Sequence, residues 1–271
     1  ACPFEFIGLG PGGDEPAGKS HVMDPASWET IFRYHEELKD GRADGLGDLL
    51  ERICPHQGAG PSVHDYIYGR PSWDIVRRLY EGRAPHVSFL DYFWTWRFTH
   101  LPMFRLLHAP VPEAALYHTV STGWAGLVAA TQRVRRDRPM LLTEHGIYSR
   151  ERRMEIDQAE WIYVQQQAPM TLAAGPGFFK ELWTRLFERL SRITYAHADR
   201  IVTIFEGNRQ AQIRDGADPA KTLVVPNGID MEPLAAPAGT GGSPRVAAWR
   251  VRVEVTWQER GRPQSRTLTS V

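Results

Sequence analysis

The second half of the chain alternates short apolar runs with longer amphipathic segments, and this alternation restricts the fold more than any other feature. Strands are predicted at 115–120, 139–144, 200–205 and 222–226. Helices are predicted between and around them at 123–136, 150–164, 178–197 and 207–215. Strands separated by helices need crossover connections, so we expect an α/β domain with a mostly parallel sheet covered on both faces.

The first half of the chain is predicted to be mainly helical. Asp24-Pro25 is a typical helix start, and helices are expected at 24–39, 49–53 and 72–82. The segment 87–107 is unusually aromatic, but Arg97, His100 and Pro102 interrupt it, which argues against a membrane span. We therefore predict a largely buried helix pair there.

Composition excludes several classes of function. Lys+Arg and Asp+Glu are both 32, so no net charge attracts nucleic acid, despite the basic stretches at 133–138 and 150–153. The two cysteines, Cys2 and Cys54, have no metal-ligand spacing to histidines, so no metal site is expected. The nine tryptophans could stack on sugars, although packing is the more common use of such residues.

The tail changes character after about residue 235. Residues 233–246 have linker composition, rich in Ala, Gly, Pro and Ser. Val251, Val253, Val255 and Trp257 then alternate with polar residues, as in a half-buried strand that returns through a turn. We predict a β-hairpin over 247–271, a feature foreign to a doubly wound fold.

Polar residues follow three of the predicted strands, and ligands of open α/β sheets bind beyond such carboxyl ends. His145 follows Glu144 and precedes Gly146, which would let a ligand approach the backbone. Its imidazole could donate a hydrogen bond to a sugar hydroxyl or accept a proton, or it could simply bond a local carbonyl. We take His145 as the candidate catalytic residue.

The first of these strands leads into a hydroxyl-rich turn and a helix N-terminus, which can bind a phosphate or sugar oxygen or merely be capped. Arginines at the start of the 150–164 helix could bind phosphate, or could form a solvated helix face. Glu206 could face the same cleft or cap a helix. The candidate substrate-binding residues are His118, Thr119, Ser121, Thr122, Gly123, Glu144, Gly146, Arg150, Arg152, Glu206, Asn208, Asn227 and Gly228.

Other catalytic motifs are absent from the sequence. No P-loop, H-E-x-x-H or G-x-S-x-G occurs. The run Gly8 to Gly13 matches G-x-G-x-x-G, but no helix pattern follows it and Pro11 removes a backbone donor, so an ordinary glycine-rich loop is the better interpretation.

Four motifs together resemble PelF-type glycosyltransferases of glycosyltransferase family 4. They are Tyr117-His118-Thr119-Val120-Ser121-Thr122-Gly123-Trp124, Leu142-Thr143-Glu144-His145-Gly146-Ile147-Tyr148, Ala198-Asp199-Arg200-Ile201-Val202-Thr203 with Glu206-Gly207-Asn208-Arg209, and Pro226-Asn227-Gly228-Ile229-Asp230. The resemblance covers about residues 4–232 and implies the N-terminal, acceptor-side Rossmann-like domain of a GT-B fold. By position, His145 matches the family histidine at the junction of acceptor and donor.

The resemblance also implies an activity and a setting. It implies a retaining transfer of a hexose or hexosamine from a UDP-sugar to a growing exopolysaccharide, with no cofactor or essential metal. The implied partners are the nucleotide-sugar donor, the polysaccharide acceptor and an inner-membrane Pel secretion complex, reached from the cytoplasm during biofilm formation.

Two departures from the family pattern qualify this expectation. The strand and Gly-Gly loop that open such enzymes would lie upstream of Phe4, and the 41 residues after Asp230 are too few for a second Rossmann-like domain. We therefore expect domain 1–232 to be an incomplete GT-B half that is inactive by itself. A non-catalytic module that binds a glycan or a partner is the alternative.

Overall fold

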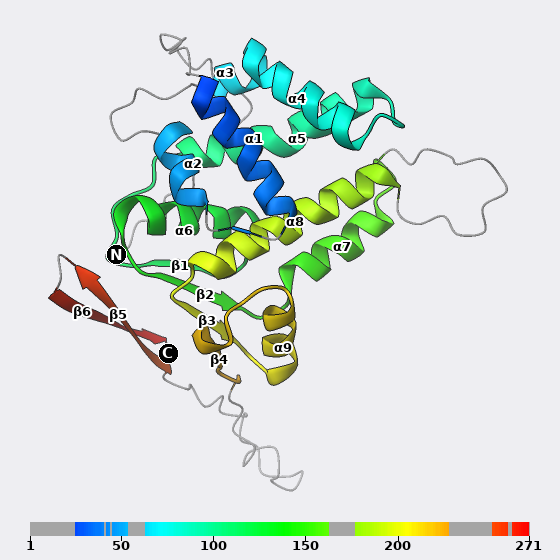
Figure 1. Cartoon of the computed structure of the whole chain (residues 1–271). Coiled ribbons are helices and arrows are strands. Elements are labelled where there is room, and N and C mark those ends of the chain that lie inside the picture. The colour runs from blue at the N-terminus through cyan, green and yellow to red at the C-terminus, as the bar shows by residue number, and fades with distance from the viewer. Residues whose placement is uncertain are drawn as a thin grey trace, which may run out of the picture.

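The computed structural model describes residues 25–40, 42–43, 45–53, 63–162, 177–227, 251–259 and 262–270. The glycine run 8–13, Gly228 and the linker 233–246 lie outside these residues. The described chain contains a four-stranded parallel sheet, a two-stranded antiparallel sheet and nine α-helices in the described ranges (Figure 1). The predicted α/β class with a parallel sheet is confirmed.

The parallel sheet consists of the four predicted strands, each shorter than the apolar run that predicts it. Its strands are β1 (Tyr117–Thr119), β2 (Met140–Glu144), β3 (Arg200–Thr203) and β4 (Thr222–Val224), in the spatial order β1-β2-β3-β4. All three strand pairs are parallel, with Thr119 opposite Leu142 and Glu144 opposite Thr203. The carboxyl ends of all four strands therefore meet at one edge.

The crossover helices lie on one face of this sheet. They are α6 (Gly123–Arg136), α7 (Tyr148–Gln158), α8 (Phe178–His197) and α9 (Glu206–Arg214), with the 3-10 turn η1 (Pro219–Lys221) before β4. Each new strand is added on the same side of the previous one, so right-handed crossovers bring successive helices to the same face. The expected helical cover of the second face is not found among the described residues, because the sequential strand order makes all three crossovers run in the same direction across the sheet.

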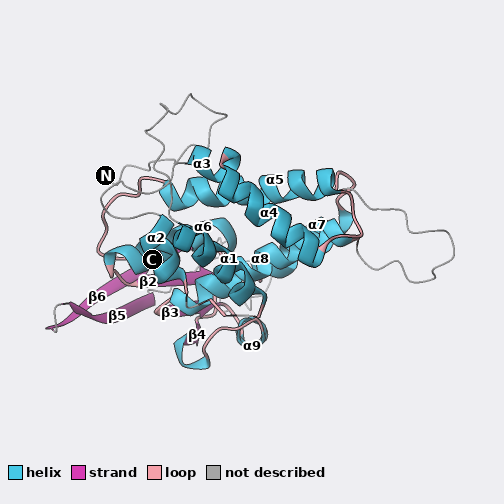
Figure 2. Cartoon of the chain, turned by 45° about the horizontal axis from the view of Figure 1, so that its top comes forward, coloured by secondary structure: helices cyan, strands magenta, loops and turns pink. Residues whose placement is uncertain are grey.

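Five further helices form a second layer on the same side of the sheet. They are α1 (Pro25–Lys39), α2 (Leu46–Ile53), α3 (Val63–Tyr68), α4 (Arg70–Arg83) and α5 (Phe89–His108). Helices α2 and α5 pack on α6, and α5 also packs on α8. Figures 1 and 2 show this stacking, with the sheet below, α6 and α8 above it, and α1 to α5 outermost. The core therefore lies between the two helical layers as well as on the sheet.

The aromatic segment at 87–107 is one helix, and the predicted helix pair is wrong. Helix α5 runs through Pro102, and it begins after Ser88, whose hydroxyl accepts a hydrogen bond from the amide of Asp91. The segment is also less buried than predicted, since Leu90 and Phe98 are 62% and 63% exposed. In the described part of the chain, no helix is long and apolar enough to cross a membrane.

Helices α6 and α8 approach each other closely at Gly126. A Cβ atom at this position would lie 2.1 Å from Oγ1 of Thr194, a buried residue on α8. Any larger side chain would push the helices apart, so this glycine fixes their spacing.

The tail forms the predicted antiparallel hairpin. Its strands are β5 (Val251–Glu259) and β6 (Arg262–Ser270), with Val251 opposite Ser270 and Glu259 opposite Arg262. The pairing extends over both strands in full, which is more than the short return strand predicted from the sequence.

Candidate functional site

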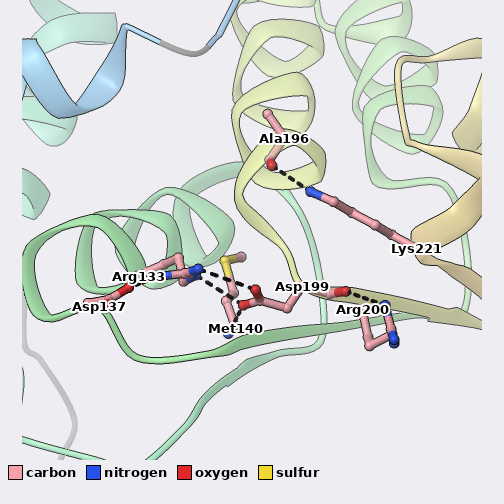
Figure 3. Close-up of polar contacts among 7 residues, drawn as sticks. All are labelled: Arg133, Asp137, Met140, Ala196, Asp199, Arg200 and Lys221. Atoms are coloured by element: carbon pink, nitrogen blue, oxygen red, sulfur yellow. Dashed lines mark hydrogen bonds and ion pairs between the residues drawn. The ribbon is translucent and has the colours of Figure 1, made fainter. Parts of the chain in front are cut away.

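The amino edge of the parallel sheet is fastened by an acidic residue and its partners (Figure 3). Asp199, just before β3, accepts hydrogen bonds from Arg133 Nε at 3.0 Å and from the Met140 amide at 2.8 Å. Lys221 Nζ donates to the Ala196 carbonyl at 3.0 Å. Asp199 thus joins α6, β2 and β3, and Lys221 joins η1 to α8, so this edge has a structural role.

At the carboxyl edge, Glu144 at the end of β2 is the corresponding fastening residue. It is 1% exposed. Its carboxylate accepts hydrogen bonds from the Tyr195 hydroxyl at 2.8 Å, Gln212 Nε2 at 3.0 Å and the Tyr148 amide at 3.1 Å. Burial raises the pKa of Glu144, and these neutral donors oppose the rise only in part. Glu144 therefore ties α7, α8 and α9 to the sheet rather than facing solvent.

The turn between β1 and α6 is joined to the same network. Thr122 is 1% exposed, and its hydroxyl lies 3.4 Å from Glu144 Oε1 and 2.8 Å from the Ser191 hydroxyl. The Thr119 hydroxyl donates to the Ser121 carbonyl at 2.7 Å, which holds the turn closed. Of these three predicted residues, Ser121 alone is partly accessible.

Gly123 begins α6 with a backbone conformation that favours glycine. Its φ is +74°, and a Cβ atom there would lie 2.4 Å from Cε1 of Tyr148. The glycine thus lets the β1–α6 turn approach the start of α7, which brings two of the strand-end loops together.

His145 lies just beyond β2 and is exposed. Asn208 of α9 donates from Nδ2 to the His145 carbonyl at 2.6 Å, so the backbone of this residue is held while the imidazole is not part of that bond. Gly146 follows, and Oε1 of Glu151 occupies the space where a side chain of residue 146 would begin. The structure brings His145, Gly146 and Asn208 together, as the strand-end argument predicts.

His118 is placed differently from the other predicted residues. It is exposed, whereas Tyr117 and Thr119 on either side are buried, so its side chain is on the sheet face opposite the crossover helices. Its Nε2 lies 2.9 Å from the Thr143 hydroxyl, and the partial burial of the ring lowers the pKa of His118. His118 is therefore separated from the Glu144 network by the sheet itself.

The two predicted arginines of α7 have different surroundings. Arg152 pairs with Glu155, and its guanidinium lies over the Tyr148 ring at 5.1 Å. Arg150 is half exposed and lies 3.9 Å from Asp215 at the end of α9. Arg150 lines a pocket between α7, α8 and α9, and Arg152 does not.

The remaining predicted residues lie at the outer ends of β3 and β4. Glu206 is exposed at the start of α9, where hydrogen bonds from Gln210 and Arg209 lower its pKa. Asn227 is exposed three residues after β4, and its neighbour Gly228 is outside the described residues. In the described ranges, no group of three or more His, Cys, Asp or Glu side chains could hold a metal ion.

Sequence reasoning missed the residues that hold Glu144 in place. Tyr195 and Gln212 are 0% exposed and belong to α8 and α9. Tyr195 lies in a helix with a strong apolar stripe, and its pattern is that of an ordinary core residue. Only the tertiary structure brings these helices to the end of β2.

The family of the chain is shown by a match to one family model over residues 14–220. The chain belongs to the DUF3492 family. This family is described as a domain of unknown function and is associated with glycosyltransferase-like proteins. The matched range includes β1 to β3 with their connecting helices and ends before β4 and the hairpin β5–β6. No curated protein and no solved structure matches the chain.

Proposed function

We propose that this chain provides the acceptor-side domain of a retaining glycosyltransferase that uses a UDP-hexose or UDP-hexosamine donor to extend an exopolysaccharide. The observation that carries the proposal is the exposed imidazole of His145 at the carboxyl edge, on a backbone held by Asn208 and above the buried Glu144 network. Membership of a family associated with glycosyltransferase-like proteins supports it.

His145 has a chemical part in this proposal. Glycosyl transfer removes a proton from the acceptor hydroxyl while the sugar–diphosphate bond breaks. An imidazole can donate a hydrogen bond to a sugar hydroxyl or accept a proton near neutral pH. Because Asn208 fixes the backbone at this position, the ring is attached to a rigid support, which reduces the entropy lost when a substrate binds.

The other edge residues divide into two groups in this proposal. Ser121, Gly146, Glu206 and Asn227 lie at accessible or partly accessible positions of the strand-end loops and would contact substrate. Glu144, Thr122, Thr119 and Asn208 are buried, so we assign them positioning roles. No cofactor or metal is part of the proposed reaction, and the proposed setting is the cytoplasm beside an inner-membrane secretion complex.

The test is calorimetric titration of hexosamine oligosaccharides into the chain, because binding of the acceptor does not need the donor-binding domain. His145→Ala removes the ring but keeps the carbonyl that Asn208 binds, so the fold should be preserved. We expect it to weaken oligosaccharide binding at least tenfold, whereas His64→Ala on α3 should leave binding unchanged. Absence of binding, or equal affinity of the wild type and His145→Ala, would contradict the proposal.

A second candidate function is glycan binding without transfer. A catalytic base is usually oriented by a hydrogen bond from a neighbouring side chain. Among the described residues, no side chain makes such a bond with the His145 imidazole, and this favours binding over catalysis. Saturable oligosaccharide binding that depends on His145, without any UDP release even when a donor-binding domain is supplied, would support this candidate over the enzyme.

A further inference from the structure

Four arginines from three helices surround one pocket on the helical side of the domain. The pocket has a volume of about 480 Å³ and lies between α7, α8 and α9. Its lining includes the carboxylates Glu188 and Asp215 and the four arginines Arg150, Arg153, Arg192 and Arg214. We call it the arginine pocket. Arg150 is the single candidate residue from the sequence that also lines it.

The charges of the arginine pocket are not balanced. Four guanidinium groups face two carboxylates, which leaves a net charge of +2. Arg153 pairs with Glu188, and Arg150 lies 3.9 Å from Asp215, which is a long contact for an ion pair. The side chains of Arg192 and Arg214 make no hydrogen bond or ion pair with another residue in the described part of the chain.

The surroundings of Asp215 show that these charges act on one another. Burial raises the pKa of Asp215, while Arg150, Arg214 and Arg192 lower it. The stem of Arg192 also lies beside the backbone just after α9, because a Cβ atom on Gly216 would be 3.6 Å from Cγ of Arg192. Two unpaired guanidinium groups from different helices are thus close to the same partly buried carboxylate.

We propose that the arginine pocket binds the diphosphate group of a small molecule. Guanidinium groups bind phosphate oxygens through paired N–H donors, and two or more of them can share one diphosphate. A solvated helix face would place its arginines along one helix, whereas these converge from three helices on a hollow large enough for a ligand. The pocket is a second ligand site, and His145 is not part of its lining.

The test is calorimetric titration of sodium pyrophosphate into the full chain at low ionic strength. We expect one saturable site, weakened at least tenfold in the double variant Arg192→Gln/Arg214→Gln. Arg185→Gln is the matched control, because Arg185 is an exposed arginine of α8 that pairs with Glu181 outside the pocket lining. Absence of binding, or equal weakening by the control, would overturn the proposal.

A variant with the opposite expected effect separates binding from misfolding. Asp215→Asn removes a carboxylate that competes with the ligand for the arginines, so the affinity for pyrophosphate should rise several-fold. An unchanged or lower affinity would count against the proposal, since damage to the fold cannot tighten binding.

A parallel titration with UDP identifies the source of the diphosphate. Loss of UDP affinity in the double variant would assign the pocket to a nucleotide diphosphate, and binding of pyrophosphate alone would assign it to a simple diphosphate. Failure of this proposal is distinguishable from failure of the glycosyltransferase proposal, because His145→Ala should leave pyrophosphate binding intact.

Discussion

The two edges of the parallel sheet are each fastened by one acidic residue, but in different ways. At the amino edge, Asp199 faces the cation Arg133, and both side chains are about a quarter exposed, at 26% and 28%. At the carboxyl edge, Glu144 is buried, and the groups that donate hydrogen bonds to its carboxylate are neutral. At the amino edge, a partly exposed ion pair is enough to join the strands to α6. At the carboxyl edge, the buried Glu144 instead supports the strand-end loops, whose outer residues such as His145 stay accessible.

The largest effect is expected when the anchor of the carboxyl edge is removed. Glu144→Ala would leave Tyr195, Gln212 and the Tyr148 amide without their acceptor in a buried site, and would also create a cavity. We expect the free energy of unfolding to fall by about 3 kcal/mol. Urea denaturation measures this, and a loss below about 1 kcal/mol would mean that the network adds little.

Removal of the amino-edge anchor should have a smaller effect. Asp199→Ala removes the acceptor of Arg133 and of the Met140 amide, and we expect a loss of about 2 kcal/mol in unfolding free energy. Asp199→Asn keeps one acceptor oxygen and should lose less. Pyrophosphate affinity should be unchanged in both variants, and a change would show that the amino edge influences the arginine pocket.

The pH dependence of stability sharpens the contrast between the two acids. Because the pKa of Glu144 is raised in the folded protein, the folded state binds more protons than the unfolded state above the usual glutamate pKa. The contribution of Glu144 to stability is therefore complete at low pH and declines as the pH rises through the raised pKa. Urea denaturation across this range should show a decline in the wild type that Glu144→Ala lacks.

The smallest effect on stability is expected from His145→Ala. The ring is exposed and the carbonyl that accepts from Asn208 remains, so the unfolding free energy should change by less than about 0.5 kcal/mol. A substantial loss of stability would instead show that the His145 ring helps to hold the carboxyl edge together, as Glu144 does. The contrast between accessible and buried residues at this edge would then be wrong.

The sequence predicts the elements of the α/β region well where the apolar pattern is strong. Helices α6 and α8 have the predicted bounds, because their apolar residues recur at helical spacing along the whole length. Helix α5 is not split as predicted, since its neighbours pack against it on both sides of Pro102 and stabilise the helix through the proline.

The candidate site is predicted less completely than the fold. The rule for strand ends correctly brings His145, Gly146 and Asn208 together. The same rule wrongly groups His118 with these residues. Whether a strand residue points toward the crossover helices or away from them depends on where the helices pack, which the strand-end pattern does not show. It also gives no sign that Glu144 is buried, since Tyr195 and Gln212 reach it from helices that are distant in sequence.

The sequential strand order has a consequence for how the domain folds. Each strand of the parallel sheet pairs with the strand that precedes it in the chain, so β4 joins β3 without waiting for β1. The loop closed at each step contains little more than the crossover segment, which keeps the entropic cost of every step low. The connection from Glu144 to Arg200 is the longest of the three, so the pairing of β2 with β3 closes the largest loop and is the costliest step. A fault introduced at β1 should therefore slow the pairing of β1 with β2 and leave the pairing of β3 with β4 unaffected.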